Sequence, residues 1–277
     1  MSIKFDLVSA DINGKMFHGL LADRFDSKCA VIHIHGTGGD FYSNPFVIPT
    51  ATEYASRNFS FMTVNVPGSK SSAATEDFSE FTEAIDTWID RFCREKQLII
   101  QGHSLGALKA LFYLGNGRGR FSGNVVGLVL LAPFDVVAFY AGVESHYTES
   151  RALVAKEFDE DSESMVPKSI FAKWPISSRT YLQLTEDGGV ADLFPSRKGM
   201  EGALLPRLQV PVHVSIGTSD FASFPSPAAV GDMIAEIANV DVSLVCGAPH
   251  NFRNHTGELV DGLANWLDAL SKVGRIK

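Results

Sequence analysis

Short apolar runs that alternate with segments of helical periodicity make up most of the chain. The runs interpreted as strands cover residues 2–12, 16–22, 29–34, 61–66, 98–101, 125–132, 210–216 and 240–245. Apolar side chains recur at spacings of three and four, the period of a helix, in residues 75–96, 106–114, 227–238 and 256–272. This alternation predicts right-handed βαβ units. The expected fold is therefore of the α/β class, with a mostly parallel, doubly wound sheet of about eight strands.

Two segments refine this outline. The run 125–132 (VVGLVLLA) is too apolar for a half-exposed strand, so we expect it at the centre of the sheet, covered on both faces. Roughly eighty residues without a convincing strand follow it, up to the run that starts near 210. A structureless connection of that length would be unusual. We therefore expect a single domain, residues 1–277, with a helical cap inserted at about 134–208 between the sixth and seventh strands.

Composition excludes several classes of partner. The formal net charge of −8 argues against nucleic acid, because phosphate binding needs a positive surface. No apolar run approaches the length of about 20 residues that spans a bilayer, and the first residues lack the apolar core of a signal peptide. Cys29, Cys93 and Cys246 lie in separate apolar segments and are expected as buried reduced thiols. We predict a cytoplasmic protein, without a nucleic-acid or membrane partner, as a monomer or homodimer.

The pattern G-x-S-x-G occurs once where a buried strand gives way to a helix, as Gly102-His103-Ser104-Leu105-Gly106. A sharp strand-to-helix turn holds a serine hydroxyl clear of the backbone, and side chains in place of the two glycines would collide with neighbouring elements. The same turn leaves the Leu105 amide at a helix N-terminus, where it can stabilise developing negative charge. Ser104 is the predicted nucleophile. His103 is expected to pack or hydrogen-bond beside it.

A glycine-rich loop, His35-Gly36-Thr37-Gly38-Gly39, follows the predicted strand 29–34 directly. Acyl-transfer sites of the strand–turn–helix type take a second oxyanion donor from a backbone N–H in such a loop. Thr37 is the preferred donor and Gly38 the alternative. His35 is expected to brace the loop through hydrogen bonds rather than to transfer a proton.

The acid and base of a Ser–His–Asp triad are expected later in the chain, each after a strand. The segment IGTSD ends at Asp220, and the segment CGAPH ends at His250. Each follows a predicted strand, so both residues should lie at the edge of the sheet that carries Ser104. We predict that His250 takes the Ser104 proton and returns it to the leaving group, and that Asp220 fixes the tautomer of His250.

Other residues of suitable type offer alternatives. Asp135, which also follows a strand, could be the acid in place of Asp220. His255 lies at the start of the last predicted helix, where a capping or surface role is favoured. The pair His33 and His35 lacks the further ligands of a zinc site, so no metal or other cofactor is predicted. The segment GNGRG follows a helix and is interpreted as a turn rather than as a phosphate loop.

The motifs GHSLG, HGTGG, IGTSD and GAPHNF together resemble the α/β-hydrolase superfamily over nearly the whole chain. The resemblance implies the α/β-hydrolase fold and hydrolysis without a cofactor. In the insertion, AKEFDEDSESMVP, WPISSRTYLQL and DLFP are similar to the fungal siderophore esterases of the fusarinine-hydrolysing type and their bacterial relatives. That likeness implies intracellular hydrolysis of an ester, without any cofactor. The chain departs from the fungal pattern in being short and in its HGTGG loop.

The cap is where substrate specificity is expected, because a lid over the strand ends forms the walls of a cleft. Its aromatic residues fit either an acyl or aryl pocket or the cap's own small core; they are Phe134, Phe139, Tyr140, Tyr147, Phe158, Phe171, Trp174 and Tyr181. Residues 144–164 hold seven acidic side chains against Arg151 and Lys156. An amine-bearing substrate would suit that balance, although a solvated helix face explains it more simply.

The sequence thus predicts a serine hydrolase that cleaves the carboxylic ester of a small molecule. The same triad would serve a thioester or amide hydrolase, or an acyltransferase. The alternative from another class is a small-molecule-binding protein on a hydrolase scaffold, because fold does not dictate function.

Overall fold

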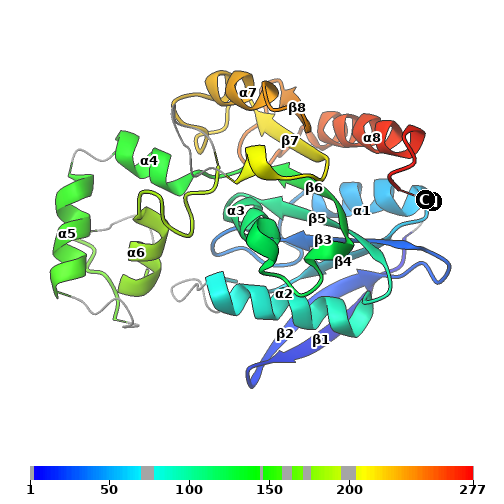
Figure 1. The fold of residues 1–277 in the computed structure, drawn as a ribbon, viewed down its shortest axis with the longest axis horizontal. Coiled ribbons are helices and arrows are strands. Elements are labelled where there is room, and N and C mark those ends of the chain that lie inside the picture. Colours follow the sequence, from blue (N-terminus) through cyan, green and yellow to red (C-terminus); the bar gives the residue numbers. More distant parts are fainter. Residues whose placement is uncertain are drawn as a thin grey trace.

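The computed structural model describes residues 3–69, 78–143, 146–157, 164–170, 176–194 and 204–276. Its centre is an eight-stranded sheet (Figure 1). The strands are β1 Asp6–Ile12, β2 Lys15–Ala22, β3 Cys29–Ile34, β4 Ser60–Val64, β5 Gln97–His103, β6 Val125–Leu131, β7 Val212–Gly217 and β8 Val240–Val245. They lie in the order β1-β2-β4-β3-β5-β6-β7-β8. All neighbours from β4 to β8 pair in parallel, while β2 is antiparallel to both β1 and β4. The predicted α/β class and strand number are confirmed.

The first two strands form the predicted hairpin. Asn13 and Gly14 connect them with φ angles of 53° and 76°. Positive φ at both central residues is the requirement of a type I′ turn, which asparagine and glycine meet at little cost. The hairpin places β2 against β4 at one edge of the sheet.

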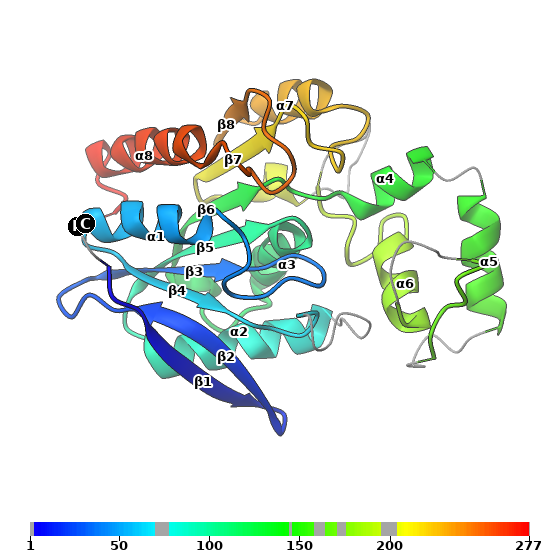
Figure 2. The ribbon, with the colours of Figure 1, turned by 180° about the vertical axis from the view of Figure 1, so that it is seen from behind.

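Helices cover both faces of the sheet. They are α1 Val47–Ser56, α2 Phe78–Phe92, α3 Leu105–Leu114, α7 Pro227–Ala235 and α8 Thr256–Lys272. Apolar residues of α2, α3 and α7 share one core, and those of α1 and α8 share the other (Figures 1 and 2). Alternate residues of β6 supply the two cores, Leu128 and Leu130 on one side and Val129 and Leu131 on the other. This strand is therefore central, as its unbroken apolar run predicts.

Some element boundaries differ from those expected. The fourth strand begins at Ser60 and ends at Val64, and β7 begins at Val212 rather than at 210. Pro211 precedes β7 and has no N–H to donate to the sheet. Helix α2 covers Phe78–Phe92, which is shorter than the predicted 75–96; of that range, 75–77 lie outside the described residues. Helix α1 was not predicted.

The described parts of the insertion between β6 and β7 include three α-helices. They are α4 Val136–Val143, α5 Tyr147–Glu157 and α6 Ser178–Thr185, which stand together beyond one end of the sheet (Figures 1 and 2). Val154 of α5 and Tyr181 of α6 are buried and belong to the same apolar cluster as α2 and α3. Of the cap aromatics, Phe158, Phe171 and Trp174 lie outside the described residues.

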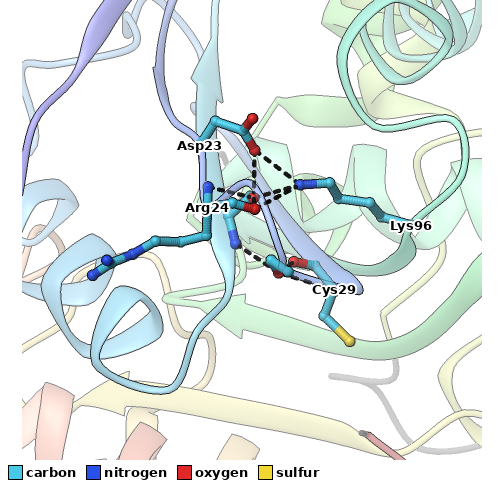
Figure 3. A network of polar contacts seen from close by, with 6 residues as sticks. Asp23, Arg24, Cys29 and Lys96 are labelled. Carbon is cyan, nitrogen blue, oxygen red and sulfur yellow. Dashed lines mark hydrogen bonds and ion pairs between the residues drawn. The ribbon is translucent and has the colours of Figure 1, made fainter.

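A network of hydrogen bonds lies at the end of the sheet where β4 and β5 begin (Figure 3). The Lys96 ammonium donates to Asp23 Oδ1 at 2.8 Å and to Ser60 Oγ at 2.7 Å, and Ser60 Oγ donates to the same carboxylate oxygen at 2.8 Å. The backbone N–H of Arg24 also reaches Ser60 Oγ, at 3.0 Å. Partial burial raises the pKa of Asp23, but the hydrogen bonds from Lys96 and Ser60 outweigh it, so the pKa lies below its usual value. The network ties the connection after β2 to the starts of β4 and β5.

The three cysteines differ in their exposure to solvent. Cys29 and Cys93 are buried as predicted, whereas Cys246 is exposed, so the prediction was wrong for that residue. It follows β8, which is the last strand of the sheet and has one unpaired edge. Among the described residues, no helix has both the length and the apolarity needed to cross a bilayer.

Candidate active site

Ser104 lies in the turn between β5 and α3. Its backbone has φ 57° and ψ −127°, a strained conformation for a residue with a side chain. The neighbouring central strand restrains it, because the Ser104 N–H donates to the carbonyl of Leu131 at 2.9 Å. A residue held in this conformation between strand and helix presents its hydroxyl away from both elements.

Three glycines allow the backbone to crowd around Ser104. A Cβ atom on Gly102 would lie 2.3 Å from the Gly106 carbonyl oxygen, and one on Gly106 would lie 2.4 Å from the Ile34 carbonyl oxygen. A Cβ on Gly36 would lie 2.7 Å from the Ser104 Cβ. Real Cβ contacts are not this short. The two motif glycines and Gly36 therefore bring the β3 loop directly against the serine.

Ser104, His250 and Asp220 form a continuous chain of hydrogen bonds. The Ser104 Oγ lies 2.9 Å from His250 Nε2, and His250 Nδ1 lies 2.8 Å from Asp220 Oδ1. With the Nδ1 proton donated to Asp220, Nε2 is free to accept the serine proton. Asp220 and Ser104 are both buried, with exposed fractions of 3% and 8%. The loops after β5, β7 and β8 bring the three residues together at the carboxyl ends of parallel strands.

The side chains distinguish Asp220 from the alternative acid. Asp220 Oδ1 also accepts the Ala222 N–H at 2.8 Å, which fixes the carboxylate in its turn. Asp135 Oδ1 instead accepts the Ala138 N–H at 2.9 Å, in the first turn of α4. That contact is an N-terminal helix cap. In this structure Asp220, and not Asp135, is the carboxylate bonded to His250.

The predicted oxyanion donors differ in what their amides do. Leu105 is the first residue of α3, so its N–H has no acceptor within the helix. The Gly38 N–H donates to the Gly68 carbonyl at 3.0 Å. The Gly38 amide is therefore occupied by the segment after β4, which makes Gly38 the weaker candidate. Thr37 lies in the same loop, beside Gly36, and its role as the second donor stays a prediction.

His35 makes loop contacts of the kind expected for it. Its Nε2 accepts the Val66 N–H at 3.3 Å and its Nδ1 lies 2.7 Å from the Gly36 carbonyl. Burial, together with the nearby charge of Lys109, lowers the pKa of His35 to about 4. The ring is therefore neutral near pH 7, with the Nδ1 proton donated to Gly36. It links the loop after β3 to the segment after β4.

His103 contacts the base rather than the nucleophile. Its Nε2 lies 3.0 Å from the backbone carbonyl of His250, and the two rings lie 5.0 Å apart. Its Nδ1 faces the Asn44 amide nitrogen at 3.5 Å. Burial, and then the proximity of His250, lower the pKa of His103 to about 3. The neutral ring donates from Nε2 and thereby holds the loop that carries His250.

Aromatic rings enclose the other side of His250. The ring centroids of Phe221 and His250 are 4.9 Å apart, and those of Phe134 and His250 are 6.5 Å apart. Phe139 of α4 completes the group, 5.2 Å from Phe134 and 6.4 Å from Phe221. His250 and the three phenylalanine rings therefore form one cluster. Phe134 comes from the loop after β6, Phe139 from the cap and Phe221 from the loop after β7.

A second Ser–His–Asp set occurs on β7 and β8. His213 Nδ1 lies 2.7 Å from Asp241 Oδ2, and His213 Nε2 lies 2.9 Å from Ser215 Oγ. His213 and Ser215 are completely buried, and the His213 ring packs near Trp266 of α8. No substrate can reach a serine in that position. The set is a structural hydrogen-bond chain inside the fold.

The remaining candidate histidines stand apart from the triad. His255 occupies the N-cap position of α8 and lies 3.7 Å from Glu258. His33 Nδ1 lies 3.1 Å from the Gln101 amide nitrogen, whereas His35 contacts Gly36 and Val66, so the two histidines have different partners. Within the part of the chain that the structure describes, no three His, Cys, Asp or Glu residues are grouped so that they could hold a metal ion.

Comparison with known proteins assigns the fold to a family. The model of the alpha/beta hydrolase family matches residues 31–261. The chain belongs to the alpha/beta hydrolase family. A comparison with curated protein sequences gave no significant match.

Solved structures superpose on almost the whole chain. A soluble variant of monoglyceride lipase from Saccharomyces cerevisiae has a TM-score of 0.71 at 12% identity, covering 100% of this chain and 97% of that one. The siderophore hydrolase EstB from Aspergillus fumigatus has a TM-score of 0.67 at 16% identity, with 96% and 98% covered. Est1E from Butyrivibrio proteoclasticus, solved with ferulic acid, has a TM-score of 0.65 at 14% identity, with 94% and 97% covered. At such identities the likeness shows the fold alone.

Sequence reasoning named the three residues of the hydrogen-bonded chain but missed two of their neighbours. Phe221 follows Asp220 directly, and Asn44 lies in the loop after HGTGG. A phenylalanine next to a predicted catalytic acid is a signal that could have marked the first. Asn44 lies in no recognisable motif.

Proposed function

We propose that this hydrolase cleaves a carboxylic ester through an acyl-enzyme on Ser104. The observation that carries the proposal is the chain of two hydrogen bonds, 2.9 and 2.8 Å long, from Ser104 through His250 to the buried Asp220. A serine hydroxyl is a weak nucleophile until a base accepts its proton, and an orienting acid keeps that base in the right tautomer.

In the first half of the reaction Ser104 Oγ attacks the ester carbonyl while His250 Nε2 accepts the serine proton. The carbonyl oxygen becomes an oxyanion, which the amides of Leu105 and Thr37 stabilise. The tetrahedral intermediate collapses when His250 gives its proton to the ester oxygen. The alcohol leaves and the acyl group stays on Ser104.

In the second half a water molecule takes the place of the alcohol. His250 accepts a proton from the water as its oxygen attacks the acyl-enzyme carbonyl. Collapse of this second intermediate returns the proton to Ser104 and releases the carboxylic acid. Asp220 stabilises the imidazolium in both halves without itself taking the proton.

The electrostatics of α3 support this assignment. The positive end of a helix dipole lies at its N-terminus, and Ser104 immediately precedes the first residue of α3. The loop after β3 approaches Ser104 so closely that a Cβ atom added at Gly36 would collide with the serine side chain. Donors fixed in this way need no reorganisation when negative charge develops.

The proposal is tested by covalent labelling with a fluorophosphonate, read by intact mass. We expect one adduct on the wild type and none on Ser104→Ala. Hydrolysis of p-nitrophenyl esters of rising chain length should fall by about three orders of magnitude or more in the variant, as for other triad nucleophiles. The panel includes a fusarinine-type ester, which tests the resemblance of the insertion to the siderophore esterases.

The chain supplies its own matched control. Ser215→Ala removes the hydroxyl of the buried Ser–His–Asp set and should leave labelling and hydrolysis intact. A folded wild type that neither reacts nor turns over any ester would refute the hydrolase proposal and favour a binding protein. Product formed with an added alcohol or amine, in preference to water, would identify an acyltransferase instead.

A further inference from the structure

Phe221 is the most solvent-exposed of the three phenylalanines that pack near His250. Phe134 is buried, Phe139 is partly buried and Phe221 is 68% exposed. The rings therefore run from the backbone beside Ser104, through the cap, to solvent. The Phe134 N–H lies 3.4 Å from the Ser104 carbonyl oxygen, which fixes the inner end of the series at the nucleophile.

The backbone fixes the exposed ring as well. The Asp220 N–H donates to the Gly217 carbonyl at 3.0 Å, and the Ala222 N–H donates to Asp220 Oδ1 at 2.8 Å. Phe221 lies between these two bonds. The turn that orients the predicted acid therefore also directs the ring toward His250, at 4.9 Å between centroids. An exposed aromatic side chain held in this way has apolar surface available to a ligand.

The mechanism decides which part of an ester meets this ring. His250 must give its proton to the oxygen of the departing alcohol, so that oxygen lies near Nε2 in the tetrahedral intermediate. The carbonyl oxygen lies on the other side, toward the amides of Leu105 and the β3 loop. Groups attached to the alcohol oxygen therefore extend past the His250 ring and its aromatic neighbours.

We propose that Phe221 and Phe139 form a subsite for the alcohol portion of the ester, and that this portion is apolar and of the size of an aromatic ring. The proposal rests on the proposed function and extends it to the substrate. Phe221 is the specificity-determining residue, because its exposed surface can contact the substrate, whereas Phe134 is buried and packs against the site's backbone.

The alternative explanation is that Phe221 only shields His250 from water. The two explanations differ in which step they affect. The alcohol is present during acylation and has left before deacylation, whereas His250 acts in both halves of the reaction. A subsite for the alcohol therefore affects acylation, and a shield affects both steps.

The experiment compares Phe221→Ala with the wild type on two matched ester series. One series keeps the acetyl group and varies the alcohol through methyl, butyl and benzyl; the other keeps methanol and varies the acyl group through acetyl, butyryl and phenylacetyl. For Phe221→Ala we expect kcat/KM to fall about tenfold or more for benzyl acetate and least for methyl acetate, since removing apolar pocket surface costs on this scale. The acyl series should show no comparable trend.

Pre-steady-state kinetics with p-nitrophenyl acetate separates the steps. The rate constant for acetyl-enzyme breakdown should change far less than the rate constant for its formation. Phe221→Leu, which keeps an apolar side chain, should recover part of the loss. Phe25→Ala removes another exposed ring and should change neither series. Phe25 lies in the loop after β2, at the end of the sheet where β3 and β4 begin, away from Ser104.

Each contrary result overturns the subsite. A loss that grows with the acyl group would place the acyl portion at Phe221, and a uniform loss with slower deacylation would make Phe221 a shield. If the wild type hydrolyses no ester and takes no fluorophosphonate, the proposed function fails and the subsite fails with it. If the wild type hydrolyses esters but Phe221→Ala has the same kcat/KM as the wild type across the alcohol series, the subsite alone fails.

Discussion

The imidazole of His103 donates a hydrogen bond from Nε2 to the backbone carbonyl of His250, across 3.0 Å. The residue before the predicted nucleophile thus holds the main chain of the predicted base. Ser104 and His250 come from loops after β5 and β8, which are separated in the sheet by β6 and β7. His103 fixes the distance between these loops independently of the reacting atoms.

His103→Ala should therefore lower kcat more than it changes KM, by about tenfold to a hundredfold, because small misplacements of a reacting group are costly. Steady-state kinetics on a short-chain p-nitrophenyl ester provides the measurement. Asn44→Ala removes only the weaker 3.5 Å contact to His103 and serves as the control, with an effect of about threefold at most. Equal kinetics for both variants would contradict a positioning role.

Acid should destabilise the fold through His103 and His35. Their pKa values are lowered to about 3 and about 4, first by burial, whereas both should titrate near 6.5 in the unfolded chain. Between those values the unfolded state binds protons that the folded state does not. The free energy of unfolding therefore falls as pH decreases, by about 1.4 kcal/mol per pH unit for each histidine.

Urea denaturation at pH values between 6 and 4 measures this slope. The difference between the wild type and His103→Gln isolates one histidine from the carboxyl groups, which titrate in both proteins. We expect the slope of the variant to be smaller by about 1.4 kcal/mol per pH unit. Parallel curves for the two proteins would show that His103 is already protonated in the folded state.

Asp220→Asn and Asp135→Asn should separate the two predicted acids. Loss of the carboxylate at Asp220 leaves His250 without the acceptor that fixes its tautomer, and kcat should fall by about 10⁴-fold. Asp135→Asn should retain most of the activity, because the amide oxygen can still accept the Ala138 N–H and cap α4. The reverse order of activities would identify Asp135 as the acid.

Gly36→Ala should impair both the fold and the site. The new Cβ would lie 2.7 Å from the Ser104 Cβ, so the β3 loop must move away from the serine and carry the predicted donor Thr37 with it. We expect a lower melting temperature and a loss of kcat of about tenfold or more. Gly257→Ala in α8 meets no atom within 4 Å, and its melting temperature should be unchanged or slightly higher. Similar results for both substitutions would mean that the loop has room to spare.

Lys96→Met should weaken the fold without affecting catalysis. The variant removes the donor to Asp23 and Ser60, and charged hydrogen bonds of this kind contribute about 1–3 kcal/mol each. Because the Asp23 carboxylate is about half exposed, water replaces part of the loss, and we expect about 1 kcal/mol. Chemical denaturation gives this value, and kcat/KM of the same sample provides the control. A large fall in kcat/KM would indicate that the edge of the sheet at Lys96 is coupled to the site.

Several strands could be predicted because they are short apolar runs, and the last helix because its apolar residues keep one strong period. Strands β3 and β8 and helix α8 have the bounds expected from their apolar residues. Helix α1 could not be predicted in the same way. It contains Pro49, which is tolerated only because it lies in the first turn, where the N–H has no helical acceptor. A proline within ten residues of mixed polarity hides the helical pattern of α1, which packs against both α8 and β4.

The residues of the site could be predicted as far as strand ends determine them. Ser104, Asp220 and His250 each follow a strand of one parallel sheet, so their common edge follows from the alternation of strands and helices. The sequence favours Asp220 and keeps Asp135 as the alternative, because both follow strands and only the loop conformations direct one carboxylate to His250. The occupied amide of Gly38 and the exposure of Phe221 likewise depend on loops and on the cap.

The cap divides the predicted catalytic residues between two stretches of chain. Ser104 precedes the insertion, whereas Asp220 and His250 follow it, and the two parts meet through the pairing of β6 with β7. A chain cut between α5 and α6 would thus yield one fragment with the predicted nucleophile but no base, and another with the predicted base but no nucleophile. Neither fragment would hydrolyse an ester alone, so recovered activity would be a direct assay of their reassembly. The cap is in this sense a natural position at which to build a split-enzyme reporter.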